Sequence, residues 1–92
     1  MGNISRFNIR TLMTEYNLQH AIETGTGGCG SIDEILKLPF KTIQSVEINP
    51  AWAANAKHRY QNKKNVTIYV GESAHQLPYM LMAIPPGENV LF

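Results

Sequence analysis

The feature that most constrains the fold is the alternation of short apolar runs with segments of helical character. Runs with the composition of β-strands occupy residues 19–24, 41–48, 65–70 and 89–92, and a segment that can form a helix lies between each pair. Strands that alternate with helices in this way are typical of a parallel sheet joined by right-handed crossovers. The pattern therefore predicts an α/β fold with a parallel sheet of about four strands and flanking helices. At 92 residues, the chain is long enough for one such domain, residues 1–92.

The segments between the strands carry helix signals of different kinds. Ser31 and Glu34 have the S-x-x-E spacing of a capping box, so a helix is predicted to begin at Ser31, and Pro39 is expected to end it. Asn49 followed by Pro50 predicts an N-cap and the first residue of the next helix. A further short helix is predicted over residues 74–83, and the residues 85–87 form a turn before the last strand.

Apolar residues at helical or strand spacing predict which side chains face the core. The first helix, residues 8–16, is expected to bury a stripe of four residues, and the later elements contribute the rest. These predicted inward-facing residues are Ile9, Leu12, Met13, Tyr16, Ile32, Ile35, Leu36, Ile43, Val46, Ile48, Trp52, Ala53, Ala56, Tyr60, Leu77, Met80 and Leu81.

Charge and cysteine content exclude several classes of function. The net charge of +1 provides no strong field for nucleic acid or an anionic membrane, so neither partner is indicated. The single cysteine, Cys29, cannot form an internal disulfide, which suits a reducing compartment, and a cytoplasmic location is the expectation. His20, His58 and His75 lack metal-ligand spacing, so we expect them on the surface or on helix faces and predict no metal site.

A glycine-rich stretch after the first predicted strand is the strongest functional signal. Gly25, Gly27 and Gly30 have the G-x-G-x-x-G spacing of a dinucleotide-binding turn. Glycine lets a ligand approach the backbone closely, and the helix that follows offers N–H donors to an anion. Glu47 ends the second predicted strand about 20 residues later, where an acidic side chain can accept hydrogen bonds from ribose hydroxyls. The combination predicts a ligand that contains adenosine.

NAD and S-adenosylmethionine both satisfy these requirements, and two further features favour the second. Glu23 precedes the glycines in an E-x-G-x-G arrangement, where its carboxylate would crowd a pyrophosphate but suits the cationic amino acid part of S-adenosylmethionine. Glu72 and Ser73 directly follow the third predicted strand, where the acid can accept from the adenine amine. The alternative interpretation is that both residues belong to the start of a helix: Glu72 is an acid favoured by the helix dipole, and Ser73 caps the helix.

Three segments together resemble the S-adenosylmethionine-dependent methyltransferases with the Rossmann-like fold. They are AIETGTGGCGSI, IQSVEINPAWAANAKHRY and NVTIYVGESAHQLPYML, and the resemblance extends from about His20 to Phe92. It implies a three-layer fold with strand order 3-2-1-4, the first part of the seven-stranded sheet that is usual in the family. Two departures are that Glu72 stands where the family more often has Asp, and that Cys29 stands where its third glycine falls.

The resemblance also implies a role for each matching position. Glu23 and the backbone from Thr24 through Gly25 and Thr26 to Gly27 would face the methionine part of the cofactor. Glu47 would hold the ribose hydroxyls, and Ile48 would lie against the adenine face. Glu72 would accept from the adenine amine, and the Ser73 N–H would donate to the ring. The resemblance assigns no catalytic residue and no methyl acceptor.

Three functional hypotheses follow. The first is an S-adenosylmethionine-binding methyltransferase domain, for which we expect residues beyond this sequence or a partner to complete methyl transfer. The alternatives are an NAD-binding Rossmann fragment and a non-catalytic cofactor-binding or assembly module. In the order 3-2-1-4 the fourth strand lies at an edge, with unpaired backbone groups beside the apolar residues 90–92. We therefore expect the chain to be either part of a longer enzyme or a domain that self-associates through this edge.

Overall fold

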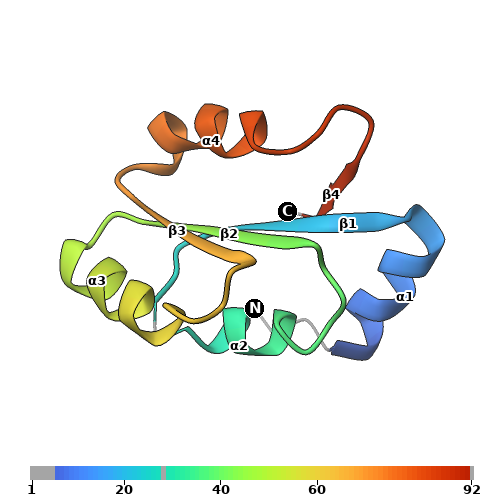
Figure 1. Cartoon of the computed structure of the whole chain (residues 1–92), viewed down its shortest axis with the longest axis horizontal. Helices are drawn as coiled ribbons and strands as arrows, with labels where there is room; N and C mark the ends of the chain where they lie inside the picture. The colour runs from blue at the N-terminus through green and yellow to red at the C-terminus, as the bar shows by residue number, and fades with distance from the viewer. Residues whose placement is uncertain (1–5, 28, 92) are drawn as a thin grey trace.

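A computed structural model describes the backbone of residues 6–27 and 29–91 and the side chains of residues 11–27 and 29–91 (Figure 1). Helices and strands alternate along this part of the chain. The elements are α1 (Arg6–Tyr16), β1 (Leu18–Thr24), α2 (Gly30–Ile35), β2 (Thr42–Glu47), α3 (Pro50–Arg59), β3 (Val66–Val70), α4 (Ser73–Met82) and β4 (Asn89–Leu91).

The four strands form one parallel sheet in the order β3-β2-β1-β4. β1 and β2 pair from His20 opposite Thr42 to Thr24 opposite Val46. β2 and β3 pair from Ile43 opposite Val66 to Glu47 opposite Val70. β4 is the shortest strand and pairs with the beginning of β1 across a register shift. The predicted α/β class, the parallel sheet and the strand order are therefore confirmed.

The helices cover both faces of the sheet (Figure 1). α2 and α3 lie on one face, and α4 lies on the other. The chain steps from β1 to β2 to β3 in one direction and then returns past β1 to β4, so crossovers of a single hand place α4 opposite the other two helices. The result is the three-layer arrangement that the resemblance implies.

Each face of the sheet has its own hydrophobic cluster. The larger cluster joins α1, α2 and α3 to the sheet, and its fully buried members include Ile32, Ile43 and Ala53. The smaller cluster consists of Ile22, Val46 and Met80, with Tyr69, Leu77 and Val90 packed against it under α4. Alternate residues of β1 and β2 supply the two clusters because successive side chains of a strand point to opposite faces.

The predicted start of α3 is confirmed, and one of its predicted core residues is not. The Asn49 side chain accepts hydrogen bonds from the backbone N–H of Ala51 (2.9 Å) and of Trp52 (3.3 Å), and Pro50 is the first helical residue. Ala53, Ala56 and Tyr60 are buried as predicted. The prediction that Trp52 packs against the sheet is wrong, because its side chain is 54% exposed. Position 52 lies in the first turn of α3, beside the glycine-rich turn, where Trp52 lies against Gly27.

The predicted capping box at Ser31 and Glu34 is also wrong. α2 begins at Gly30, its N-cap is Cys29, and no side chain caps it. Cys29 has a φ of 73°, and its left-handed conformation starts the helix before Ser31. Ser31 is therefore a helical residue in the first turn. The helix ends at Ile35, well before Pro39.

Several residues at the edges of the predicted apolar stripes are exposed. Tyr16 is 59% exposed at the end of α1, and Ile48 is 64% exposed because β2 ends at Glu47. Leu12 and Leu81 are also partly exposed, so the predictions for these four side chains are wrong. Met13 and Met80 are buried as predicted. The side chain of Ile9 and the whole of Phe92 lie outside the described residues.

A polar group centred on a buried histidine, named here the His20 cluster (His20, Lys41, Thr42 and Glu88), joins β4 to the beginning of the sheet. His20 is only 2% exposed, which corrects its predicted surface position. Its Nε2 lies 2.5 Å from Glu88 Oε1, and its Nδ1 lies 2.6 Å from Thr42 Oγ1. Lys41 Nζ donates to the same Glu88 oxygen at 3.4 Å. A histidine placed in a strand is buried here because both ring nitrogens have partners.

Candidate functional site

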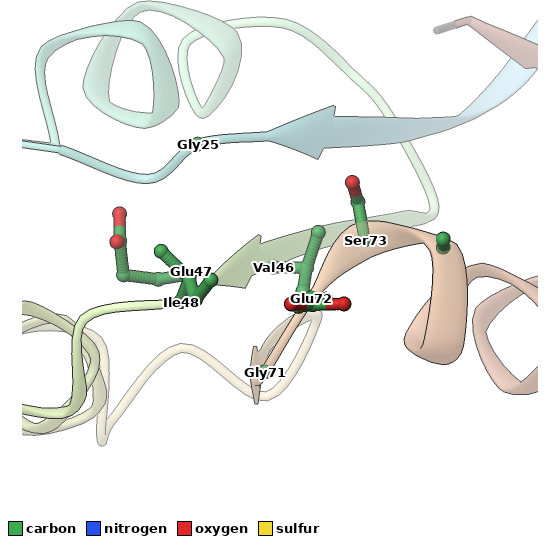
Figure 2. A pocket seen from close by; sticks show the side chains of 8 residues that line it. Gly25, Val46, Glu47, Ile48, Gly71, Glu72 and Ser73 are labelled. Carbon is green, nitrogen blue, oxygen red and sulfur yellow. The ribbon is translucent and has the colours of Figure 1, made fainter.

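A cleft with a volume of about 380 Å³ opens where β1, β2 and β3 end (Figure 2). The carboxyl ends of parallel strands are where open α/β sheets bind their ligands, because the loops there diverge around the strand ends. The residues that line the cleft come from the end of β2, the loops after β1, β2 and β3, and the beginning of α4. They are Gly25, Val46, Glu47, Ile48, Gly71, Glu72, Ser73 and Ala74.

The glycine turn, whose described part is residues 24–27 and Cys29, forms one side of the cleft through Gly25. Gly25 has a φ of 85° and Gly27 a φ of 53°, so both use the left-handed conformation that favours glycine. The Gly25 N–H donates to the Val46 carbonyl at 2.9 Å, which ties the turn to β2. The space that a Cβ on Gly25 would occupy is open, so a ligand can reach the backbone there.

Glu47 lies between the glycine turn and the loop after β3, and it is only 6% exposed. Its Oε1 accepts from the Gly27 N–H at 3.0 Å, and its Oε2 accepts from the Asn49 N–H at 2.9 Å. These backbone donors lower the pKa of Glu47 below its ordinary value, with the Asn49 N–H as the largest cause. The backbone N–H groups of Ile48 and Thr26 contribute smaller effects in the same direction, so the carboxylate faces a set of backbone donors and stays ionised.

The opposite side of the cleft is formed by the loop after β3. Gly71 adopts a φ of 134°, and its N–H donates to the Glu47 carbonyl at 2.9 Å. Glu72 follows as the N-cap residue of α4, and its exposed side chain makes no cap hydrogen bond. Glu72 Oε2 lies 4.0 Å from His75 Nδ1. Ser73 begins α4 and, like Glu72, lines the cleft.

Ile48 provides an apolar surface beside these polar groups (Figure 2). It follows Glu47 directly, lines the cleft and is the most exposed of the large apolar side chains there. An exposed isoleucine next to a buried carboxylate can pack against a planar ring whose attached polar group reaches the carboxylate. The cleft thus combines an ionised acceptor, an apolar surface and open backbone.

Glu23 and Thr26 lie in a separate polar group with Ser45. The Ser45 hydroxyl donates to Glu23 Oε1 at 3.4 Å and lies 2.7 Å from the Thr26 hydroxyl. Burial raises the pKa of Glu23, and hydrogen bonds from Ser31 and Ser45 oppose that effect. Glu23 does not line the cleft described above. Its predicted contact with the methionine part of a cofactor stays a prediction.

The structure thus brings together five of the nine predicted site residues, which are Gly25, Glu47, Ile48, Glu72 and Ser73. Thr24 and Thr26 lie in the adjoining turn, and Gly27 reaches the cleft through its hydrogen bond to Glu47. Sequence reasoning missed Ser45, which holds Thr26 and Glu23. The sequence carries no distinctive signal for this role, because β2 (TIQSVE) contains other polar residues besides Ser45.

Cys29, the one thiol, is fully buried, in keeping with the interpretation that it fills the loop. Within the described residues, no group of three or more His, Cys, Asp or Glu side chains is arranged to hold a metal ion. In the same part of the chain, no helix has the length and apolar character that crossing a bilayer requires.

Comparison with models of known protein families finds no match to this chain, and a search of curated proteins finds no significant relative.

Proposed function

We propose that this chain is an S-adenosylmethionine-binding domain of the Rossmann-like methyltransferase type. The observation that carries the proposal is the position of Glu47. It is an ionised, largely buried carboxylate at the end of β2, between the glycine turn and Glu72. An acid at this place is suited to a pair of ribose hydroxyls.

In the proposed complex, each part of the cofactor meets a group of matching chemistry. The ribose hydroxyls would donate to the Glu47 carboxylate, and the adenine ring would pack on Ile48. The adenine amine donates to Glu72, and the Ser73 N–H donates to a ring nitrogen. The methionine part extends along the glycine turn toward Glu23. The open space at Gly25 supports this path because a side chain there would narrow it.

The proposed chemistry is direct transfer of the methyl group from the sulfonium to a nucleophile held in line with the S–C bond. The sulfur keeps the electron pair of the broken bond and becomes a thioether, and the acceptor loses its proton to a base. The contribution of this domain is to hold the donor in position, since orientation supplies much of the rate in such reactions. The acceptor and the base are assigned to residues outside this sequence or to a partner.

Isothermal titration calorimetry with S-adenosylmethionine, S-adenosylhomocysteine and NAD tests the binding part of the proposal. We expect the first two to bind and NAD to bind much more weakly. Replacing Glu47→Gln removes a charged acceptor and should weaken S-adenosylhomocysteine by about 10- to 100-fold. Glu34→Gln, on the exposed surface of α2, is the control and should bind like the wild type. Tighter binding of NAD, or no binding of either sulfur compound, overturns the proposal.

A methyl-transfer assay with labelled S-adenosylmethionine separates an enzyme domain from a binding module. Transfer of label to an added acceptor or to a co-purified partner supports the methyltransferase assignment. Binding without transfer to any acceptor supports the module instead. The proposed location is the cytoplasm, in keeping with the single unpaired thiol.

We also propose that the free edge of β4 pairs with a second copy. β4 lies at the edge of the sheet, and β1 pairs with only one side of it. Exposed N–H and C=O groups on such an edge favour strand pairing. Sedimentation equilibrium should therefore show reversible, concentration-dependent association. A chain that stays monomeric at the highest concentrations contradicts this part of the proposal.

A further inference from the structure

The end of α3 is bonded to the beginning of α2 on the far side from the cleft. Tyr60, the C-cap residue of α3, is buried, and its hydroxyl lies 2.7 Å from Asp33 Oδ1 and 3.1 Å from the Cys29 carbonyl. Arg59 adds two hydrogen bonds to the Asp33 carboxylate, from Nε and Nη2. None of these side chains lines the cleft.

This contact acts together with the burial of Ile32 to hold a short helix in place. α2 is only six residues long, and its N-cap residue, Cys29, supplies no side-chain cap. A helix this short is unstable by itself, so its position depends on tertiary contacts. Asp33 lies in its first turn, and the Asp33 N–H also donates to the Cys29 carbonyl, at 3.0 Å. The Tyr60 hydroxyl thus contacts both ends of that first hydrogen-bonded turn.

The charges at this contact favour the arrangement over a wide pH range. Hydrogen bonds from Arg59 lower the pKa of Asp33, so the carboxylate stays ionised and accepts. Burial raises the pKa of Tyr60 above its ordinary value, so its hydroxyl keeps the proton that it donates. The Arg59 guanidinium also lies 5.9 Å from the centre of the Tyr60 ring.

The glycine turn is consequently fixed at two points. At one end, the Gly25 N–H is bonded to the Val46 carbonyl. At the other end, the Cys29 carbonyl lies 3.1 Å from the Tyr60 hydroxyl and shares its single proton with Asp33 Oδ1. Between them the Gly27 N–H reaches Glu47 Oε1. Freeing either end would let the turn move away from Glu47.

We infer that Tyr60 is a positioning residue for the cleft: its hydroxyl fixes Cys29 and Asp33 and so keeps the Gly27 N–H on Glu47. The effect on ligand affinity rests on the proposed function, whereas the effect on the turn does not. Tyr60 touches no ligand in this arrangement, and it acts through the backbone of the turn.

Tyr60→Phe tests the inference because it removes the hydroxyl and leaves the ring in the core. Amide hydrogen exchange, followed by NMR on the ligand-free protein, should show faster exchange at Gly27. Calorimetry should show S-adenosylhomocysteine bound about fivefold more weakly, the equivalent of one lost hydrogen bond. Asp33→Asn, a milder change at a half-exposed position, should shift both measurements in the same direction.

Glu88→Gln is the matched control, because it weakens the fold at the His20 cluster, at the other end of the sheet. It should lower the melting temperature without changing the affinity or the local exchange at Gly27. If Tyr60→Phe behaves like this control, the hydroxyl is only a general stabilising contact and the inference is overturned. If the wild type binds no S-adenosylhomocysteine, the proposed function fails, and the Gly27 exchange still decides the inference.

Discussion

Cys29 occupies a left-handed backbone conformation, with a φ of 73°, while its side chain is completely buried. Such a conformation brings Cβ close to the backbone and costs an ordinary residue on the order of 1 kcal/mol, whereas glycine adopts it freely. The family resemblance places a glycine at this position. The cysteine side chain is small enough to tolerate the strained backbone conformation, and it also fills space in the core beside Ile32.

Replacements at Cys29 should therefore separate strain from packing. We expect Cys29→Gly to change the free energy of unfolding by less than about 1 kcal/mol, because relief of strain offsets the lost side-chain contacts. Cys29→Val should cost about 2 kcal/mol or more, because a β-branched side chain is incompatible with the positive φ. Urea denaturation measures both. Equal stability of the two variants would show that the backbone conformation at Cys29 imposes no strain.

Residue-level predictions from the sequence succeed where a local motif defines the position. Glu47 and Ile48 could be placed at the end of the second strand because a strand end followed by Asn-Pro is recognisable from adjacent residues alone. The partners of Glu23 could not, because Ser45 comes from a neighbouring strand whose register the sequence does not state. The contacts of the Tyr60 hydroxyl could not be predicted for the same reason. Helical spacing indicates that the ring is buried but not which residues its oxygen contacts.

At the scale of elements, α3 has the most complete helix start in the described chain. The Asn49 side chain accepts two backbone N–H groups, and Pro50 needs no partner because it has no N–H. Asn49→Ala should lower the free energy of unfolding by about 1 kcal/mol, the usual cost of losing an N-cap. Asn49→Ser should recover most of the loss in thermal or urea unfolding. A loss in both variants alike would mean that Asn49 acts by something other than capping.

β4 depends on the His20 cluster, and this dependence gives it a pH response. Hydrogen bonding from His20, with a smaller effect of Lys41, lowers the pKa of Glu88 below the ordinary 4.5. Ionised Glu88 therefore stabilises the fold fully above that ordinary value, and the stabilisation is lost as pH falls through the lower pKa of the folded state. Glu88→Gln should flatten the loss of stability between neutral and acidic pH.

Glu34→Gln is the control for this prediction, because Glu34 forms only an exposed pair with Lys37. It should retain the acid sensitivity of the wild type. Hydrogen exchange at Val90 and Leu91 should rise in Glu88→Gln and stay unchanged in the control. Identical pH profiles for the two variants would exclude the His20 cluster as the support of β4.

Element boundaries show what local signals can and cannot supply. Asn49-Pro50 predicts the start of α3 correctly because both residues act within one turn of the helix. Ser31 and Glu34 have the correct spacing for a capping box, but the left-handed Cys29 starts α2 earlier. The spacing of Trp52 is helical, yet its ring is exposed because the first turn of α3 lies beside the glycine turn rather than over the sheet.

At the scale of the whole molecule, the alternation of elements predicts the parallel sheet and the resemblance implies the strand order, and the structure confirms both. Which side chains complete the two hydrophobic clusters depends on how the helices tilt against the sheet. The periodicity of the sequence does not determine that tilt. The domain is small, and chains of this size have thin stability margins because little of their surface is buried. Ligand binding should therefore have a large effect on unfolding.

If the proposed function holds, S-adenosylhomocysteine at 100 times its dissociation constant adds about 2.7 kcal/mol of stability. For a domain of this size, that corresponds to a rise in melting temperature of roughly 10–20 °C. A thermal shift assay measures it directly. Glu47→Gln should show little shift at the same ligand concentration. A wild-type melting temperature that does not respond to the ligand would contradict the proposal.

The position of Trp52 makes its fluorescence sensitive to movement of the glycine turn. It is the single tryptophan of the sequence, it is half exposed, and its Cζ3 lies 3.7 Å from where a Cβ on Gly27 would be. Any displacement of the turn changes the solvent around the indole, and the emission wavelength and quantum yield of tryptophan respond to that change. Ligand binding, and the increased mobility of the glycine turn expected in Tyr60→Phe, can therefore be followed by intrinsic fluorescence without an added label.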